Sequence, residues 1–181
     1  MGAKTLLTVD QFEQLPEEEA IRHELDEGEL VDVSGATYQH NSIRDHLIEI
    51  LRAFLRAGRL GRVIAEQEFR LSPDTVRRPD VALIGPANLA SVEPEKSIQT
   101  FAPDLAVEIS SPSDSFDALA RKTRQYLAAG TKTVWIIAAS VQEIHVFTKA
   151  GRAVVLEAGD ALTEPDLLPG FSLAVRDLFE G

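Results

Sequence analysis

The sequence predicts an α/β fold with a mixed β-sheet flanked by two main helices. Three observations carry this prediction. Residues 41–57 and 114–129 each carry apolar side chains at helical spacing. Shorter apolar or alternating runs, bounded by turn residues, outnumber these helices and are typical of strands. The run Thr133-Val134-Trp135-Ile136-Ile137 is apolar almost throughout, as expected of a central strand covered on both faces.

Length and composition limit the possible classes of protein. The 181 residues, 44% of them apolar and 26% charged, are most simply one domain over residues 1–181. The absence of cysteine excludes disulfides, thiolate metal sites and a cysteine nucleophile. No apolar stretch approaches the roughly 20 residues that span a bilayer, and residues 1–7 make a poor secretory signal. We therefore expect a soluble cytoplasmic protein with no membrane partner.

The charge balance is acidic, with a net charge of −11 and a pI of about 4.8. A simple nucleic-acid-binding protein usually shows a basic face instead. The basic residues Arg52, Arg56 and Arg59 lie at helical spacings of four and three, so they are expected to share one helix face. A solvated helix face is the preferred explanation of this stripe, and a local phosphate-binding surface is the alternative.

Turn and capping signals define the elements of the first third of the chain. An acidic helix is expected over residues 8–20, with Thr8 as its N-cap. Two strands on either side of Glu27-Gly28 are expected to form a hairpin. The amphipathic helix over residues 41–57 should end at Gly58.

The remaining elements follow from alternation and apolar runs. Strands are expected over residues 62–71, 78–84 and 104–110, the first two separated by the turn Ser72-Pro73-Asp74. The second long helix has Ser113 as its expected N-cap and Gly130 at its C-terminal end. Its expected buried stripe is Phe116, Leu119, Thr123, Tyr126 and Leu127. After the central strand, short strands are expected over residues 143–148, 152–156 and 171–175.

Two carboxylates stand in runs that otherwise resemble buried strands: Asp80 and Glu108. A buried charge is costly unless it is paired or bound to a metal. Two carboxylates near one point suit a hard divalent cation, and Lys122 on the following helix could add a positive charge. In the strand over residues 104–110, Glu108 should face the opposite side from Leu105, Val107 and Ile109.

The predicted geometry allows Lys122 to reach Glu108. Lys122 lies about 12 Å along its helix by the helical rise, and Glu108 about 7 Å back along its strand. A flexible lysine stem pointing toward the helix N-terminus could cover the difference. Proximity of the two side chains is therefore feasible.

This site would hold Mg²⁺ or Mn²⁺ on Asp80 and Glu108, with waters and a backbone carbonyl such as that of Ile109. The cation would activate water against a phosphodiester, and Lys122 would orient the water or stabilise negative charge. Structural explanations exist for each residue alone: Asp80 paired with Arg77 or Arg78, Glu108 in a salt bridge, Lys122 solvated. The order of the three residues together favours the metal site.

An ordered series of segments surrounds these residues: Glu24-Leu25, Gly28-Glu29-Leu30-Val31, His40, Arg78-Pro79-Asp80-Val81, Val107-Glu108-Ile109-Ser110-Ser111-Pro112-Ser113-Asp114, Lys122, Tyr126, Gly130, Trp135 and Leu168-Pro169-Gly170-Phe171. The series resembles the PD-(D/E)XK nuclease superfamily, and more closely its Uma-two-type branch of restriction-endonuclease-like proteins. The superfamily lysine would stand at position 110, where this chain has Ser110. In the branch the lysine stands on the next helix, and Lys122 fits that place.

The resemblance implies a restriction-endonuclease-like core and a Mg²⁺-dependent endonuclease, a hydrolase acting on DNA. Asp80 and Glu108 would be its metal ligands and Lys122 its catalytic lysine. Glu24 and His40 fall at matching positions that border the pocket. From the sequence, His40 could equally be a helix-cap hydrogen-bonding residue.

A second hypothesis is an inactive nuclease fold that serves as a dimeric binding or regulatory module. The family often has an acid just after the Trp-containing strand, whereas this chain has Ala138 and Ala139 there. The predicted hairpin over residues 143–156 could form a homodimer through its edge. A second Pro-Asp pair, at Asp104, precedes Glu108 in the same strand, so those two carboxylates should not converge.

Overall fold

The computed structural model describes residues 6–33, 35–56, 58, 60–111 and 114–180. Its centre is a six-stranded sheet with the strand order β11-β10-β9-β8-β6-β3. These strands are β3 (Arg62–Ala65), β6 (Val81–Ile84), β8 (Leu105–Ile109), β9 (Thr133–Ala138), β10 (Glu143–Thr148) and β11 (Ala153–Leu156). Only β8 and β9 pair in parallel; the other neighbours are antiparallel. The predicted mixed α/β architecture is therefore confirmed.

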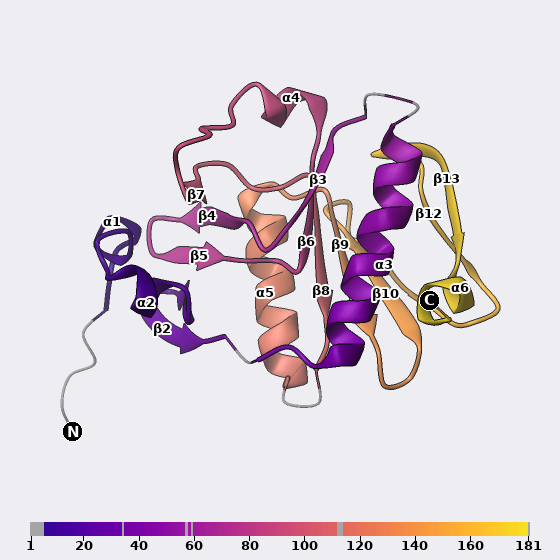
Figure 1. Cartoon of the computed structure of the whole chain (residues 1–181), viewed down its shortest axis with the longest axis horizontal. Helices are drawn as coiled ribbons and strands as arrows, with labels where there is room; N and C mark the ends of the chain where they lie inside the picture. Colours follow the sequence, from indigo (N-terminus) through magenta and orange to yellow (C-terminus); the bar gives the residue numbers. More distant parts are fainter. Residues whose placement is uncertain (1–5, 34, 57, 59, 112–113, 181) are drawn as a thin grey trace.

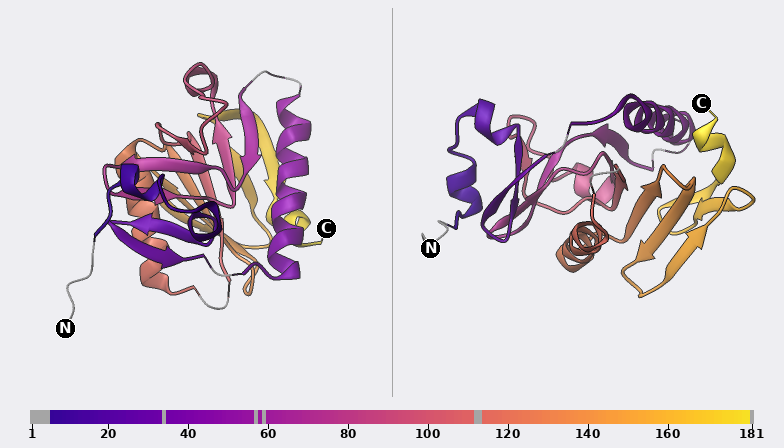
Figure 2. Two further views of the ribbon diagram at one scale, coloured as in Figure 1. Left: turned by 60° about the vertical axis from the view of Figure 1, so that its left-hand side comes forward. Right: turned by 90° about the horizontal axis from the view of Figure 1, so that it is seen from below.

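Two long helices cover opposite faces of this sheet (Figures 1 and 2). Helix α3 (Tyr38–Leu55) packs against β3 and β8, with Leu47 and Leu51 fully buried. Helix α5 (Phe116–Ala129) packs against β9 on the other face, where Tyr126 contacts Ala106 and Val134. The alternation predicted for β8 is present, because Leu105, Val107 and Ile109 join the core beneath α3.

A second sheet has the strand order β2-β1-β5-β4-β7 and lies beside α5. Its strands are β1 (His23–Asp26), β2 (Glu29–Asp32), β4 (Glu68–Ser72), β5 (Thr75–Arg77) and β7 (Ile98–Gln99). The predicted hairpin joins β1 to β2 through Glu27 and Gly28, at φ 50° and 86°. Glycine accepts this left-handed backbone without steric strain, which explains Gly28 at the turn.

The remaining elements pack around these sheets. They are α1 (Val9–Phe12), α2 (Glu17–Ala20), α4 (Pro86–Leu89), β12 (Ala161–Glu164), β13 (Leu168–Ala174) and α6 (Val175–Phe179). The β12–β13 pair and α6 follow the last strand of the main sheet, and α6 packs against α3 near the C-terminal end of the chain (Figure 1). No helix in the described ranges is both long enough and apolar enough to cross a membrane.

Several predicted boundaries were wrong. The strand expected over residues 62–71 is two strands in different sheets, because Glu66 adopts φ 51° and redirects the chain. The strand expected over residues 78–84 begins only at Val81, after the separate β5. The helix expected over residues 8–20 is two short helices, and Pro16 caps the second because proline cannot continue a helix interior.

The two long helices also begin at unexpected residues. Helix α3 starts at Tyr38, and its N-cap Thr37 accepts a hydrogen bond from the His40 backbone N–H through Oγ1. Helix α5 is capped by Ser115, whereas the predicted cap Ser113 lies outside the described residues. Phe116, predicted to be buried, is 83% exposed, because the helix begins at this residue and its first turn projects beyond the core.

Candidate active site

One pocket of about 400 Å³ collects all the predicted site residues. Its lining includes Glu24 from β1, His40 from α3, Asp80 before β6, Glu108 and Ile109 from β8, and Lys122 from α5. Its lining includes residues at or near the starts of α3 and α5, and both helices begin toward the lower edge of Figure 1. The fold therefore brings together side chains that are separated by up to 98 positions in the sequence.

Asp80 and Glu108 meet because β6 and β8 are antiparallel neighbours. Val81 pairs with Val107, so the residue before Val81 stands opposite the residue after Val107, on the same face of the sheet. The Oδ2 of Asp80 accepts a 2.7 Å hydrogen bond from the backbone N–H of Ile109. This bond ties the Asp80 carboxylate to the residue next to Glu108.

His40, at the start of α3, holds the other oxygen of Asp80. Its Nε2 lies 3.1 Å from Asp80 Oδ1. The hydrogen bond to Asp80 raises the pKa of His40, against the opposing effect of burial. His40 thus lies in the first turn of α3 and also lines the pocket. The partner of Asp80 is His40, not Arg77 or Arg78 as the alternative explanation from the sequence had it.

Lys122 stands between two carboxylates. Its Nζ lies 3.1 Å from Glu108 Oε2 and 3.1 Å from Glu24 Oε2. Its side chain is only 22% exposed, so it is not a solvated helix flank. Burial alone would lower the pKa of Lys122, but the Glu108 and Glu24 charges outweigh burial and raise it well above its usual range. Lys122 therefore remains a cation at neutral pH.

Glu108 is the buried acid of the site, with 6% exposure. Its Oε1 accepts a 2.8 Å hydrogen bond from the Tyr126 hydroxyl, one helical turn after Lys122 on α5. The pKa of Glu108 is raised to about 7: burial is the largest cause, Lys122 opposes it, and the charges of Asp80 and Glu24 add to it. Without a further cation, Glu108 binds a proton near neutral pH.

Glu24 is held by the buried Arg77, which is 2% exposed. Arg77 donates to Glu24 Oε2 at 2.9 Å and pairs with Asp26 at 2.7 Å, while the backbone N–H of Arg78 donates to Glu24 Oε1 at 2.8 Å. Burial would raise the pKa of Glu24, but Lys122, Arg77 and this N–H together lower it. Glu24 is thus the acid that stays ionised beside Lys122.

A network that sequence reasoning missed supports these residues. Gln125 of α5 accepts a 2.9 Å hydrogen bond from Arg77 Nε and donates a 2.7 Å hydrogen bond to Asp26. The network fastens α5 to β1 and β5 and so fixes the position of Lys122, less than one turn away. Arg77 is buried at the end of β5, and a buried arginine requires acidic partners; its burial was not evident from the sequence.

The second Pro-Asp pair has a separate structural role. Asp104 accepts hydrogen bonds from the Gly85 backbone N–H at 2.7 Å and from Asn88 at 2.9 Å, and it pairs with Lys132 at 2.9 Å. These contacts join the end of β6 to the start of β8, at the end of β8 away from Glu108. As predicted from the sequence, Asp104 does not converge with Glu108.

The donor set of the pocket fits a hydrated divalent cation. Each oxygen of Asp80 and Glu108 has one protein partner, and a carboxylate oxygen has lone pairs for a second. No group of three or more His, Cys, Asp or Glu in the described part of the chain is arranged around a metal. Mg²⁺ does not require such a cage, because it commonly binds one or two carboxylates and keeps several waters.

The fold has a known counterpart among solved structures. The structure described as "a putative nuclease belonging to DUF820 from Anabaena variabilis ATCC 29413" is similar to this chain, with a TM-score of 0.85 and 24% sequence identity. The similarity covers 96% of this chain and 98% of that one. At this identity the likeness shows a shared fold. None of the curated proteins matches the chain.

The family assignment rests on the sequence. The Uma2 family, described as "Putative restriction endonuclease", matches residues 9–176, which is nearly the whole chain. The matched range contains all the residues that line the pocket. This protein belongs to the Uma2 family of restriction-endonuclease-like proteins.

Proposed function

We propose that this protein is a metal-dependent endonuclease that hydrolyses phosphodiester bonds in DNA. One observation carries the proposal: Asp80, Glu108 and Lys122, from three separate segments, line a single pocket. Lys122 contacts Glu108 directly, and Asp80 accepts a hydrogen bond from the residue next to Glu108. Membership of the Uma2 family and the nuclease fold of the structural neighbour support the same class of activity.

In this proposal Asp80 and Glu108 hold Mg²⁺ or Mn²⁺, with the Ile109 carbonyl and waters as the further ligands. A cation bound there would polarise the scissile phosphate and lower the pKa of an attacking water. His40 keeps Asp80 oriented, and Tyr126 does the same for Glu108. Both carboxylates are therefore held in place before a cation arrives, which reduces the cost of assembling the site.

Lys122 acts as a fixed positive charge. Its raised pKa makes it a poor base, so it cannot take the proton from water at neutral pH. Its ammonium group can instead donate a hydrogen bond to the attacking water or to the oxygen where negative charge develops. Glu24 contacts the same Lys122 Nζ as Glu108 does, so Glu24 is a positioning residue.

Two exposed aromatic rings support a nucleic-acid substrate. Tyr38, the first residue of α3, is 88% exposed, and Phe116, the first residue of α5, is 83% exposed. Both stand at the helix starts that border the pocket, near Ala36, Asp114 and Ala118 in its lining. Exposed aromatic rings are platforms on which bases stack, with about 1–3 kcal/mol for each base.

A cleavage assay with a matched control tests the proposal. The protein is incubated with single- and double-stranded DNA and RNA in Mg²⁺, Mn²⁺ or EDTA, beside Asp80→Ala, Lys122→Ala and Lys149→Ala from identical purifications. Lys149 is exposed and makes no described side-chain contact, so Lys149→Ala controls for loss of one lysine. We expect metal-dependent cleavage of DNA by the parent and Lys149→Ala only.

Other outcomes contradict the proposal. Equal activity in all four preparations would indicate a contaminating nuclease. No cleavage by any preparation, together with no Mg²⁺ binding by calorimetry, would favour the inactive binding module. Preference for RNA would retain the chemistry and correct the substrate.

A homodimer through the β10–β11 hairpin is also part of the proposal. β11 is the last strand of the main sheet, and Val155 on it is 51% exposed. Such an edge can pair with its copy across a two-fold axis. Light scattering at micromolar concentration should give twice the 19.8 kDa chain mass, and a monomer mass would contradict the dimer.

A further inference from the structure

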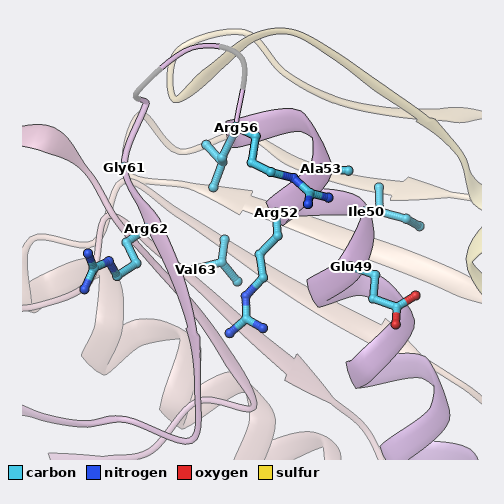
Figure 3. Close-up of a pocket in the computed structure, with 9 residues that line it drawn as sticks. Glu49, Ile50, Arg52, Ala53, Arg56, Gly61, Arg62 and Val63 are labelled. Carbon is cyan, nitrogen blue, oxygen red and sulfur yellow. The ribbon is translucent and has the colours of Figure 1, made fainter.

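A second and larger pocket lies toward the other end of α3 from the candidate active site. It has a volume of about 830 Å³ and lies between the C-terminal half of α3 and the strand β3 (Figure 3). Arg52 and Arg56 come from α3 and Arg62 from β3. Arg52 reaches from the helix toward β3, whereas Arg62 leaves the strand on its other side (Figure 3). We call this pocket the arginine groove; its three arginines flank the last strand of the sheet.

The three arginines are exposed, and none forms a hydrogen bond or ion pair through its side chain within the described residues. Elsewhere Arg44, Arg70 and Arg77 each contact a carboxylate. The chain has 29 acidic and 18 basic residues, so acidic partners are abundant. Glu49 also lines the groove, yet it makes no ion pair with Arg52 three residues later. Three unpaired arginines against one glutamate leave the groove with an excess of positive charge that is open to an anion.

Helix α3 and strand β3, which form the groove, both extend toward the active site. His40 and Arg52 are both on α3, twelve residues apart, which corresponds to about 18 Å by the helical rise. Arg62 begins β3, and Glu66, which lines the active-site pocket, follows it by four residues, about 13 Å along an extended strand. One extended anionic ligand can therefore contact both places, with about five nucleotides of a strand at 3.4 Å each between them.

We infer that the arginine groove binds the phosphate backbone of the nucleic acid whose scissile bond lies in the active-site pocket. This inference rests on the proposed function. Guanidinium groups match phosphate geometry, and Arg52 and Arg56 lie one turn apart on one helix face, so they can contact neighbouring phosphates. The contacts carry no sequence information; they fix the position of the substrate relative to Asp80 and Glu108.

The test measures binding without cleavage. A fluorescein-labelled 30-base-pair duplex is titrated in EDTA at several salt concentrations, and its anisotropy is followed. The groove variant combines Arg52→Gln, Arg56→Gln and Arg62→Gln. The control combines Arg124→Gln, Lys149→Gln and Arg152→Gln, which removes the same charge from exposed residues outside the groove. Thermal melting of both variants checks that they fold.

We expect the groove variant to lose at least about tenfold in affinity at 50 mM salt, and its salt slope to fall by about 2 to 3, near 0.9 for each lost phosphate contact. The control should change the slope by less than about 1. In the cleavage assay the groove variant should raise KM and leave kcat nearly unchanged, because backbone contacts act equally on ground and transition states.

Three results would overturn the inference. An unchanged affinity and slope in the groove variant would exclude phosphate contacts there. An equal loss in the control would assign the effect to net charge. A shift from dimer to monomer in the groove variant alone, by light scattering, would identify a second copy as the occupant. If the protein binds DNA through the groove but cleaves no substrate, the inferred role of the groove stands and the proposed nuclease activity is wrong. The two proposals can therefore fail separately.

Discussion

The Nζ of Lys122 lies 3.1 Å from Oε2 of Glu108, although fourteen residues separate them in the chain. The strand and helix that carry them run back alongside each other, so both side chains reach the same pocket. Lys122 is the cation that partly offsets the charges of Glu108 and Glu24. A metal ion would offset more of this negative charge, since the site holds more carboxylates than ammonium groups. The first predictions follow from this balance.

Lys122→Gln should reduce DNA cleavage by about 10²–10³-fold, because a fixed charge at the reacting phosphate is removed. It should also raise the pKa of Glu108, which Lys122 holds down, and so weaken metal binding at neutral pH. Single-turnover cleavage and Mn²⁺ titration by calorimetry measure the two effects. Lys149→Gln is the control, and a cleavage rate within twofold of the parent in Lys122→Gln would contradict the assigned role.

The pH dependence of cleavage should follow Glu108. Its pKa is raised to about 7, so the protonated form prevails below that pH and the carboxylate above it. Metal binding requires the carboxylate, and the rate should therefore rise about tenfold per unit up to pH 7 and level off above it. More Mg²⁺ should move the midpoint lower, since cation and proton compete. A midpoint independent of Mg²⁺ would assign the titration to another group.

Tyr126→Phe should move that midpoint to higher pH. The Tyr126 hydroxyl donates a 2.8 Å hydrogen bond to Glu108 and lowers the pKa of the acid, so removing the hydroxyl raises it. Cleavage should fall about tenfold at pH 7 and recover at pH 9. A uniform fall at every pH would indicate misfolding or a different role. Tyr38→Phe, at an exposed position, should leave the midpoint unchanged.

Arg77→Met should destabilise the fold by about 3–5 kcal/mol, the usual cost of removing one partner from a buried ion pair. Glu24 and Asp26 would both lose their buried cation. Urea denaturation measures the change. Arg70→Met is the control, because its partner Asp10 is 73% exposed, and the expected loss is below about 1 kcal/mol. Equal effects in the two variants would contradict a supporting role for Arg77.

The two Pro-Asp pairs should respond in opposite ways to Asp→Asn substitution. Asp104→Asn weakens the contacts of the buried Asp104 carboxylate to Gly85 and Lys132 and should cost about 1–3 kcal/mol of folding free energy, with cleavage retained. Asp80→Asn should abolish metal-dependent cleavage. Melting curves and cleavage rates on the same preparations compare them. Loss of activity in a folded Asp104→Asn would show that the second pair also serves the site.

Much of the local structure was readable because local physics determines it. The β1–β2 hairpin forms at Glu27-Gly28, β10 spans the predicted residues 143–148, and Gly130 ends α5 in the left-handed conformation. The breaks after Ala65 and before Val81 were not readable. Each break separates strands of two different sheets, and pairing with partners distant in sequence decides which sheet each strand joins.

The sequence by itself determined the candidate chemistry of this protein. Hydrophobic periodicity and isolated charges identified Asp80, Glu108 and Lys122, because a charge in an apolar run requires a partner wherever the run folds. Only the tertiary structure decided those partners. His40 rather than an arginine holds Asp80, and Arg77 anchors Glu24, since strand register and helix packing set distances that sequence separation does not. The unpaired state of Arg52 and Arg62 was likewise a tertiary outcome, because an ion pair forms only where the fold brings a carboxylate within reach.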